Sequence, residues 1–391
     1  MRSPRTAPWR DGHRLELLAD GERFFPAMLA AIDGAQEEIL LEFYLVEPGV
    51  VLERFTEALE RAGQRGVSVY LLVDGFGALR LSGPALQRLQ RCPGLALRWF
   101  NPLRYHSLVH NLLRDHRKLL LVDRRIVFTG GTGLTDAFLG EPMQPGWREL
   151  MLRAEGPVAE DWRTLFFSVW SIAAPSGQAS AAALTTCPVW PLSSTRQAPD
   201  LPAGGRCRLA PGGPGQGQEM KRSLLLALRS SRQRAWIATA YFIPTWKFRR
   251  ELRRAARRGV DVRLLLSGPI TDHPAIRHAA RRYYSALLRA GVRIYEYQPR
   301  FWHAKVTLCD ERVSIGSSNL DRWNLRWNLE ANLEIDDDAL AREVADQLQG
   351  DLADCLEIDA QQWPKRPLAE RLREWWWGRV ELWLERLRTV R

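Results

Sequence analysis

The sequence predicts an α/β protein made of two similar halves, each a mixed, mostly parallel sheet flanked by helices, related by pseudo-twofold symmetry. Three observations predict this fold class. A strand–helix–strand pattern occurs twice in the chain, and each copy is followed by the same short histidine- and lysine-containing motif. A stretch of different composition separates the two copies. The long repeat therefore indicates a duplicated domain and not a solenoid.

The first elements of each half form the repeated unit. Residues 39–75 read ILLEFYLVEPGVVLERFTEALERAGQRGVSVYLLVDG, and residues 236–268 read WIATAYFIPTWKFRRELRRAARRGVDVRLLLSG. Both begin with an apolar strand, continue through a short loop into a helix with apolar residues at three- and four-residue spacing, and end in a second apolar strand. A buried strand, a helix and another buried strand form a βαβ unit, whose two strands run parallel.

The later elements follow the same order in both halves. A further helix and strand are expected at 84–100 and 274–297, and a histidine-containing strand at 114–123 and 301–309. The segment between the halves is rich in Ala, Ser, Pro and Gly, which is typical of a connecting loop. We therefore expect an N-terminal half at 1–173, a linker at 174–218, a C-terminal half at 219–360 and a Trp/Arg-rich tail at 361–391.

The two histidine-containing segments share one motif, His-x-Lys-x4-Asp, followed by a glycine-led turn. Two copies at matching positions of a repeat are a strong signal, whereas one copy would be weak. In a strand, residues i and i+2 point to the same face, so each histidine and its lysine should project together. The small residues of the turn would let backbone N–H groups approach a phosphate closely. The motif residues are His116, Lys118 and Asp123 with Gly130-Gly131-Thr132-Gly133, and His303, Lys305 and Asp310 with Gly316-Ser317-Ser318-Asn319.

These motifs resemble the HKD motifs of the phospholipase D superfamily, and the resemblance extends over about residues 13–360. The segments around them are similar to those of bacterial cardiolipin synthases of the B type, which lack the two N-terminal membrane spans of the A type. These segments are LEFYLVEPG, RGVSVYLLVDGFG, RDHRKLLLVD, FTGG, WRELMLRAEGP and WNLEANLEI. The resemblance implies two phospholipase D-like halves whose motifs meet around a single phosphate.

The resemblance also implies a role for each motif side chain. His116 would attack phosphorus and form a phosphohistidine, while His303 would protonate the leaving alcohol and later deprotonate the incoming one. One imidazole must then be neutral and the other charged, so the site must hold their pKa values apart. Lys118 and Lys305 would offset the charge on the phosphate oxygens.

Other residues would support the phosphate or the histidines. The resemblance implies that Ser317 and Asn319 donate hydrogen bonds to the phosphate oxygens and that Glu330 orients His303. Asp123 and Asp310, although part of the motif, are expected to support the strands and not to touch the phosphate.

The first motif departs from the second at one position of the turn. Gly133 stands where the second motif has Asn319, so the first half lacks one side-chain donor. Thr132 or backbone N–H groups could take its place. The departure puts the symmetry of the phosphate site in doubt, but both histidines and both lysines are retained.

Composition points to an anionic partner and to no metal. Lys plus Arg outnumber Asp plus Glu by 56 to 45, which gives a net charge of +11. Such a charge suits an anionic lipid surface, a phosphorylated substrate or nucleic acid. The five cysteines are scattered, without zinc-site or redox spacing. No His/Asp/Glu cluster has metal-site spacing and two imidazoles supply nucleophile and acid, so we expect no metal and no other cofactor.

Membrane contact is expected to be peripheral. The N-terminus lacks the apolar segment of a secretory signal, and the longest apolar stretch, near 165–174, is too short to span a bilayer. The tail RPLAERLREWWWGRVELWLERLRTVR suits an amphipathic helix at an anionic bilayer interface. Packing of this helix on the protein body, or at a dimer contact, is the alternative. Its apolar stripe would consist of Leu372, Trp376, Val380, Trp383, Leu387 and Val390.

The sequence thus predicts a phosphatidyltransferase of the cardiolipin synthase type. It would transfer a phosphatidyl group from phosphatidylglycerol, or alternatively from phosphatidylethanolamine, to a hydroxyl of a second phospholipid. We expect it on the cytoplasmic face of the bacterial inner membrane, with no nucleic-acid partner. A phospholipase D or nuclease-type phosphodiesterase is the first alternative, because positive charge also suits DNA. A catalytically silent membrane-binding protein, supported only by Gly133, is the second.

Overall fold

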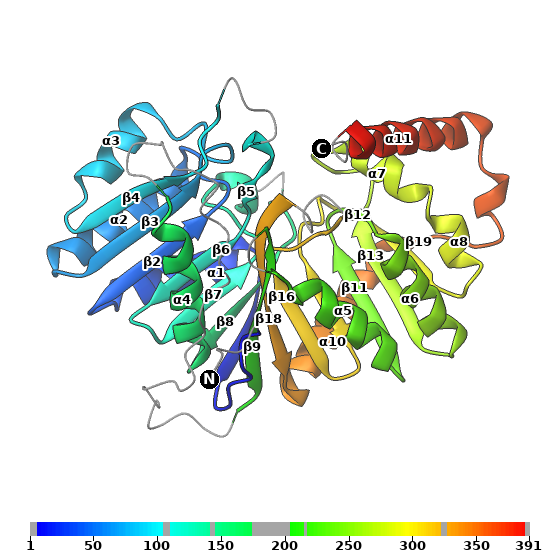
Figure 1. The fold of residues 1–391 in the computed structure, drawn as a ribbon, viewed down its shortest axis with the longest axis horizontal. Helices are drawn as coiled ribbons and strands as arrows, with labels where there is room; N and C mark the ends of the chain where they lie inside the picture. Colours follow the sequence, from blue (N-terminus) through cyan, green and yellow to red (C-terminus); the bar gives the residue numbers. More distant parts are fainter. Residues whose placement is uncertain are drawn as a thin grey trace.

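The computed structural model describes residues 6–104, 110–140, 145–173, 204–214, 217–321 and 327–387. Two large sheets lie beside each other and are covered by helices, and a small two-stranded sheet is added in the second half (Figure 1). The first large sheet, blue to cyan in the figure, belongs to the first half of the chain, and the second belongs to the second half except for one short strand, residues 114–115. The prediction of two α/β halves is therefore confirmed.

The first half begins with an antiparallel edge strand and then forms the first βαβ unit. The loop between β4 and β6 carries a short strand, β5, next to the first motif. Its elements are β1 (Arg14–Ala19), α1 (Gly21–Asp33), β2 (Glu38–Phe43), α2 (Val50–Gln64), β3 (Ser68–Asp74), α3 (Gly83–Arg91), β4 (Leu95–Phe100), η1 (His110–Leu112), β5 (Arg114–Asp115), β6 (Lys118–Val122), β7 (Ile126–Gly130), η2 (Asp136–Phe138), β8 (Leu150–Glu155) and α4 (Val158–Trp170).

The second half repeats this order and adds a C-terminal helix. Its elements are β9 (Arg206–Gly213), β10 (Gly217–Gln218), α5 (Glu219–Ser230), β11 (Arg234–Thr239), β12 (Phe242–Ile243), α6 (Trp246–Arg257), β13 (Asp261–Ser267), α7 (Pro274–Arg281), α8 (Tyr284–Leu288), β14 (Arg293–Tyr297), β15 (Val306–Cys309), β16 (Arg312–Gly316), β17 (Leu320–Asp321), β18 (Asn328–Asp336), α10 (Asp338–Ala353), β19 (Cys355–Glu357), η4 (Trp363–Lys365) and α11 (Leu368–Leu387).

The strand order shows the duplication directly. The first sheet contains the order β8-β7-β6-β2-β3-β4, and the second contains β18-β16-β15-β11-β13-β14. The predicted βαβ units are β2-α2-β3 and β11-α6-β13, and the two strands of each pair in parallel. The two motif strands, β6 and β15, each lie antiparallel beside the first strand of the βαβ unit.

The sheets are mixed, as predicted, but antiparallel pairs outnumber parallel ones. The parallel neighbours along each sheet are those of the βαβ region, β2-β3-β4 in the first half and β11-β13-β14 in the second. The motif strands instead continue through tight connections into β7 and β16, which forces antiparallel neighbours. The expectation of mostly parallel sheets was therefore wrong outside the βαβ units.

Part of the predicted linker belongs to the second sheet. Residues 206–213 form β9, which pairs antiparallel with β18 as β1 pairs with β8. The composition of this segment suggested a loop, but Cys207 and Leu209 alternate with polar residues and are buried. The second unit of the repeat therefore begins inside the predicted linker. The linker residues 174–203 lie outside the described residues.

A shared core joins the halves. One cluster of buried residues combines the inner faces of both sheets with α4 and α10, and it includes Leu121, Trp162, Leu308 and Leu333. Two further clusters fill the outer faces, one beneath α1 and α2 and the other beneath α6 to α8. Within β6, Leu119 and Leu121 face the shared core while Leu120 and Val122 face the outer one. Both faces of the motif strand are thus buried, which fixes its position.

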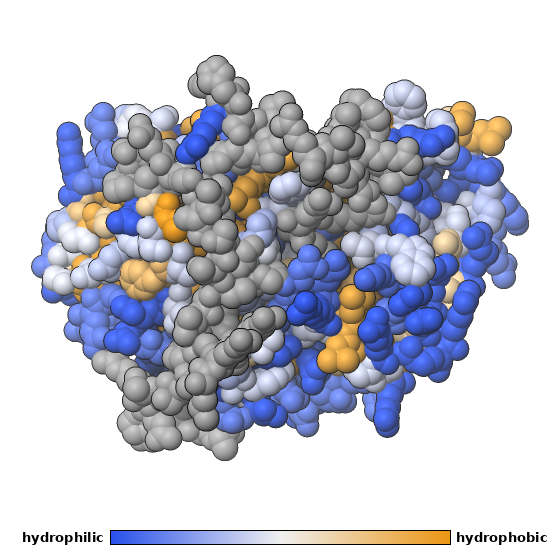
Figure 2. Space-filling model, viewed as in Figure 1, coloured by the Kyte–Doolittle hydropathy of each residue, from blue (hydrophilic) through white to orange (hydrophobic). Residues whose placement is uncertain are grey.

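The surface around α5 and α6 is polar except for one apolar patch. Figure 2 shows hydrophilic residues, in blue, over most of the part of the molecule where Figure 1 places these helices, and a hydrophobic patch, in orange, near α5. Exposed cations of α6 and its C-terminal end contribute, among them Lys247, Arg254 and Arg257. Within the described part of the chain, no helix has both the length and the apolar content that crossing a bilayer requires.

Candidate active site

The histidine and lysine of each motif lie together at the start of the motif strand. Both histidines were predicted to lie within a strand. His116 instead lies between β5 and β6, and His303 precedes β15. The two-residue spacing still brings each lysine back onto its histidine. The ammonium of Lys118 donates to the carbonyl oxygen of His116, and that of Lys305 donates to the carbonyl oxygen of His303.

Each histidine is held by the backbone of the other half. The backbone N–H of His116 donates to Leu329 O of β18 at 2.9 Å, where β5 and β18 pair in parallel. The backbone N–H of His303 donates to Arg148 O at 2.8 Å, just before β8. β8 and β18 are equivalent strands of the repeat, so each half provides the same kind of backbone hydrogen bond to the histidine of the other. These bonds bring the two motifs into one region between the sheets.

A buried carboxylate from the opposite half faces each imidazole. Glu149 Oε2 lies 2.6 Å from His303 Nδ1 in a well-aligned hydrogen bond. Glu330 Oε1 lies 2.9 Å from His116 Nδ1, but the two atoms are not aligned as a hydrogen bond. Both carboxylates are buried. The expectation that Glu330 orients His303 was therefore wrong, because β18 places Glu330 beside His116.

Glu149 is not among the site residues predicted from the sequence. Its segment, WRELMLRAEGP, is the first-half counterpart of WNLEANLEI, which contains Glu330. Matching β8 to β18 in the repeat would have drawn attention to the acidic residue near the start of each segment. Its partner could not be deduced from spacing, because His303 comes from the other half of the chain.

The two lysines are buried inside the same cluster. Burial lowers the pKa of Lys118 to about 7, although the carboxylate of Glu330 opposes this shift. Burial also lowers the pKa of Lys305, against the opposing effect of Glu149 and Glu330. Lys305 Nζ lies 3.0 Å from Nδ1 of His303 and 3.9 Å from Oε2 of Glu149. An acidic side chain from the opposite half therefore lies near each lysine, and when ionised it favours the charged form of that lysine.

Both imidazoles have depressed pKa values. Burial lowers the pKa of His116 well below its usual range, and the charges of Lys118 and Lys305 lower it further. Burial and Lys305 lower the pKa of His303 to about 4, while the hydrogen bond with Glu149 acts in the opposite direction. Lysines of both motifs therefore affect both imidazoles, which indicates that the two motifs form one electrostatic site.

The two carboxylates titrate in opposite directions. Burial raises the pKa of Glu330 to about 8, although Lys118 and a hydrogen bond from Ser317 oppose this shift. For Glu149, burial is outweighed by Lys305 and by the hydrogen bond with His303, so its pKa is lowered. At neutral pH the partner of His303 is ionised, whereas the partner of His116 is mostly protonated.

The two polar side chains of the turn after the second motif, Ser317 and Asn319, have different surroundings. The hydroxyl of Ser317 donates to Glu330 and accepts from Ala331 N at 3.1 Å, so it supports Glu330 and does not point freely at a ligand. Asn319 is buried, and neither atom of its amide has a hydrogen-bond partner within the described part of the chain. The amide of Asn319 is thus available as a donor to a ligand.

The glycines of the first turn are required by packing. A Cβ at Gly133 would lie 2.7 Å from the carbonyl oxygen of Leu45, so the side chain found at Asn319 has no room here. A Cβ at Gly131, the counterpart of Ser317, would lie 2.2 Å from Oε2 of Glu149. Thr132 is buried and donates to the carbonyl oxygen of Gly133 at 3.2 Å. The first turn therefore leaves space for Glu149 and offers no counterpart of the Asn319 amide.

Asp123 and Asp310 support the strands, as expected. Asp123 directly follows β6 and accepts hydrogen bonds of 2.7–3.1 Å from the backbone N–H groups of residues 36–38. Asp310 directly follows β15 and accepts hydrogen bonds of 2.9–3.1 Å from the backbone N–H groups of residues 232–234. The two aspartates lie at the opposite end of each motif strand from the histidine, roughly 20 Å away along an extended chain.

The surroundings of the two imidazoles differ. Three aromatic rings have centroids 5.2–5.5 Å from that of His303, and they belong to Phe138, Trp147 and Phe301. Beside His116 lies the ring of Tyr44, with its centroid at 4.8 Å.

Charged groups lie beneath His116 instead. Arg117 is fully buried and pairs with Asp115 at 3.1 Å and with Glu42 at 2.8 Å. The corresponding residues beside His303 are Trp302 and Ala304, which are buried and apolar. The first motif is therefore supported by buried ion pairs, and the second by apolar packing.

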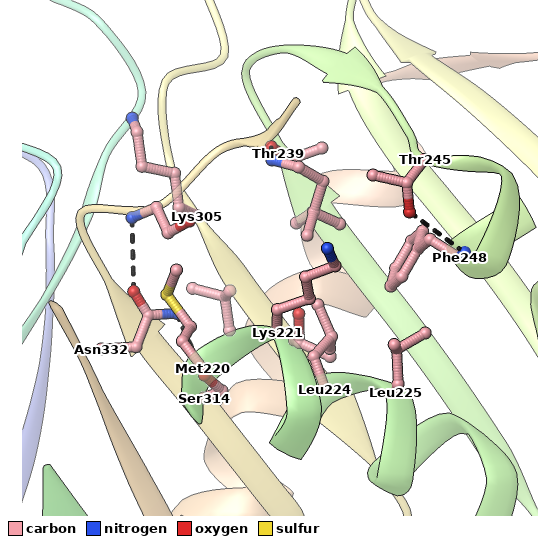
Figure 3. Close-up of a pocket in the computed structure, with 15 residues that line it drawn as sticks. Met220, Lys221, Leu224, Leu225, Thr239, Thr245, Phe248, Lys305, Ser314 and Asn332 are labelled. Carbon is pink, nitrogen blue, oxygen red and sulfur yellow. Dashed lines mark hydrogen bonds between the residues drawn. The ribbon is translucent and has the colours of Figure 1, made fainter. Parts of the chain in front are cut away.

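Open space adjoins the second motif. A pocket lies between α5, α6 and the sheet, with Lys305 and Asn332 at one side of it (Figure 3). Its apolar wall includes Leu224, Leu225 and Phe248. Among the described residues, no group of three or more His, Cys, Asp or Glu side chains is arranged to hold a metal ion.

Comparison with known proteins gives consistent matches. The family model described as cardiolipin synthase, PLD-like domain, matches residues 28–170 and 224–352. Cardiolipin synthase B of Escherichia coli K12 is 34% identical over 373 residues, which cover 94% of this chain and 86% of that protein. Cardiolipin synthase A of Pseudomonas entomophila is 34% identical over 371 residues, covering 90% of this chain and 71% of that one. The crystal structure of phosphatidylserine synthase from Haemophilus influenzae matches 98% of this chain and 97% of its own with a TM-score of 0.77, at 14% identity, and so shares the fold.

Proposed function

This chain belongs to the cardiolipin synthase, phospholipase D-like domain family and is an enzyme of the phospholipase D superfamily, and from that premise we propose that it is a phosphatidyltransferase. The resemblance found in the sequence is confirmed at this level. In the proposed reaction, the phosphatidyl group of one phosphatidylglycerol passes to a hydroxyl of another, which yields cardiolipin and glycerol. Phosphatidylethanolamine is a second donor with the same reacting phosphodiester.

One observation supports this function above all. Two imidazoles, each facing a buried carboxylate from the opposite half, share an electrostatic cluster with two buried lysines. A phosphodiester carries one negative charge, which two ammonium groups can balance, and its exchange requires one nucleophile and one acid.

The unequal carboxylates support the assignment of roles. Glu149 is ionised and hydrogen-bonded to His303 Nδ1, so it stabilises the imidazolium form of His303, which is the form that acts as a general acid. Glu330 is mostly protonated at neutral pH, so it gives little stabilisation to a charged His116. A neutral imidazole is the form that attacks phosphorus. We therefore assign His116 as the nucleophile and His303 as the acid and base.

The first step forms a covalent intermediate. Nε2 of His116 attacks phosphorus, the bond from phosphorus to the glycerol oxygen breaks, and His303 donates its proton to that oxygen. His303 has a pKa of about 4 in the free site, so it must gain its proton as the anionic phosphodiester binds and offsets the two lysine charges.

The second step reverses the first with a new alcohol. The hydroxyl of a second phosphatidylglycerol gives its proton to His303, its oxygen bonds to phosphorus, and the bond to His116 breaks. The phosphohistidine conserves the energy of the phosphodiester, so no nucleotide is consumed. In both steps Lys118, Lys305 and the amide of Asn319 are proposed to donate hydrogen bonds to the phosphate oxygens and to stabilise their negative charge.

The proposed location follows from the substrate. A phospholipid-using enzyme of this family must work at a bilayer, and we place it as a peripheral protein on the cytoplasmic face of the inner membrane. Phospholipids are its proposed partners.

Product analysis tests the function. Purified protein is incubated with phosphatidylglycerol vesicles in the presence of a chelator, and lipids and glycerol are quantified. We expect cardiolipin and glycerol in equal amounts from wild type, and neither from His116→Ala. Phosphatidate as the main product would instead identify a hydrolase, and cleavage of DNA in a parallel reaction would identify a nuclease. Either result would overturn the proposal.

A further inference from the structure

The C-terminal helix α11 packs against the protein with its polar side. Glu374 is only 4% exposed, and its carboxylate lies 2.5 Å from Nη1 of Arg366 and 3.5 Å from Nη1 of Arg281. Gly378, one turn later, accepts a hydrogen bond from Arg282 at its carbonyl oxygen. A Cβ at Gly378 would lie 2.6 Å from Cδ of Arg282, so glycine permits this contact without ending the helix. Glu374 and Gly378 are four residues apart and mark the face turned to the protein.

The apolar side of α11 consequently faces away from the protein. Trp376 is two residues beyond Glu374, which is about 200° around a helix, on roughly the opposite face. Leu372 is 65% exposed, Trp375 56% and Trp376 59%. A helix on the surface of a globular protein usually turns its apolar stripe towards the core, whereas α11 turns its apolar stripe outwards. Of the predicted stripe, Leu372 and Trp376 are exposed and Val380 is half-buried, while Trp383, Leu387 and Val390 lie outside the residues whose side chains are described.

Cations flank the exposed stripe. Arg371 and Arg379 are exposed and lie one turn to either side of Trp375. The guanidinium of Arg379 lies 5.0 Å from the centroid of the Trp375 ring. Tryptophan and arginine side by side suit the headgroup level of an anionic bilayer, where the ring sits at the acyl–headgroup boundary and the guanidinium meets phosphate. Among Leu368, Arg371, Leu372, Trp375, Trp376 and Arg379 there are two cations and no carboxylate, which complements the negative charge of an anionic bilayer.

The helix lies on the same side of the molecule as the motifs. α11 packs along α7, and Figure 1 shows both at the end of the sheets where β5 and β12 also lie. A series of ring contacts connects this region to the site. The ring centroids of His273, which precedes α7, and Tyr241 lie 5.7 Å apart. Those of Tyr241 and Phe301 lie 6.3 Å apart, and those of Phe301 and His303 lie 5.5 Å apart. Figure 2 shows orange and pale residues at the edge where Figure 1 places α11.

We propose that the outward face of α11, formed by Leu368, Leu372, Trp375 and Trp376 with Arg371 and Arg379, is the surface by which this enzyme docks on an anionic phospholipid bilayer. The face is fixed on the body through α7, so docking orients the motif side of the protein towards the lipid. This inference rests on the proposed function for its substrate, but the docking surface is testable without turnover.

Vesicle binding tests the surface. Full-length wild type and Trp375→Ala/Trp376→Ala are mixed with vesicles of phosphatidylcholine containing phosphatidylglycerol, and bound protein is measured by sedimentation. We expect the double variant to bind these vesicles at least about tenfold more weakly than wild type. Leu226→Ala is the control, because Leu226 is 57% exposed near the C-terminal end of α5, just before β11 begins and therefore at the end of the sheet opposite to β12, and its loss should leave binding unchanged. Equal binding of the double variant and wild type would overturn the proposal.

Two further measurements separate lipid docking from self-association and from a loss of catalysis. Arg371→Gln/Arg379→Gln should weaken binding to vesicles with phosphatidylglycerol and leave the weak binding to pure phosphatidylcholine unchanged. Turnover of a short-chain, monomeric phosphatidylglycerol should be retained in the tryptophan variant, so a catalytic defect and a docking defect are distinguished. If the tryptophan variant turns a dimer into a monomer in analytical ultracentrifugation and binds vesicles normally, the face belongs to a second copy of this chain and the proposal is wrong.

Discussion

His116 and His303 come from the same repeated motif, yet their surroundings differ in charge and polarity. His303 has an ionised carboxylate aligned with Nδ1 and three aromatic rings around it. His116 has a carboxyl group whose pKa is raised to about 8, a tyrosine ring, and buried ion pairs beneath it. Duplication supplied two equal imidazoles, and divergence of their neighbours allows one to be a nucleophile and the other an acid.

Removal of each imidazole is the strongest way to test this division. His116→Ala should lose about 10⁴-fold or more of kcat with every substrate, because no covalent intermediate can form. His303→Ala should lose about 10²- to 10⁴-fold with phosphatidylglycerol but regain most of the first step with a p-nitrophenyl phosphodiester, whose leaving group needs no proton. Release of p-nitrophenolate, followed by absorbance, measures that step.

A covalent adduct distinguishes the two variants further. His303→Ala should accumulate an acid-labile phosphohistidine at His116, seen by mass spectrometry under neutral conditions. If the adduct instead forms in His116→Ala, at His303, the roles must be exchanged and the carboxylates do not decide them.

Neutralising each carboxylate should have unequal effects. Glu149→Gln removes the charge that stabilises the His303 imidazolium, and we expect kcat to fall about 100-fold or more. Glu330→Gln should stay within about tenfold of wild type, because a neutral amide resembles the protonated carboxyl already present. Steady-state cardiolipin formation near pH 7 measures both, and circular dichroism checks that each variant folds. Equal losses would contradict the asymmetry.

The sequence predicted much of this arrangement, because much of it is local. The βαβ units, the motif strands and the roles of Asp123 and Asp310 follow from apolar patterns and from a repeat compared with itself. The Glu149–His303 pair could not be predicted in this way. It depends on hydrogen bonds from the backbone N–H groups of His303 and Ala304 to Arg148 O, between segments that are far apart in the sequence and meet only when the two sheets associate.

Two other segments have partners that their sequence does not show. Ser317 was expected to donate to phosphate, and in the structure β18 brings Glu330 within reach of its hydroxyl, which donates to the carboxyl group. The segment containing β9 was expected to be a loop, because its Gly and Pro content hides two buried apolar residues that complete the second sheet. In both cases a neighbouring strand determined the outcome, and its position is not encoded in the segment itself.

The aromatic rings around His303 give a smaller contrast. In the proposed mechanism His303 activates the acceptor, and we expect these rings to limit the access of water to it, so Trp147→Ala should raise the ratio of phosphatidate to cardiolipin severalfold. Tyr44→Ala, the matched change beside His116, should raise this ratio less, because the proposed nucleophile does not deprotonate the acceptor. Thin-layer analysis of radiolabelled products gives the ratio. A larger increase in Tyr44→Ala would show that water reaches the phosphohistidine from the His116 side.

The smallest expected effect concerns the alkaline limb of the pH profile. Glu330 is protonated below about pH 8, and above it the carboxylate places a negative charge 2.9 Å from His116 and repels the anionic phosphodiester. We therefore expect kcat/KM to fall as the pH rises from about 7, where Lys118 begins to lose its charge, through about 8, where Glu330 gains one. The hydroxyl of Ser317 donates to the carboxyl group and lowers its pKa, so Ser317→Ala should move this fall to higher pH, by up to about one unit. Glu330→Gln should remove this ionisation and leave only that of Lys118, whose charge loss also weakens substrate binding. An unchanged alkaline limb in Glu330→Gln would assign the fall to Lys118 alone, and the comparison of the two dyads would then rest on Glu149.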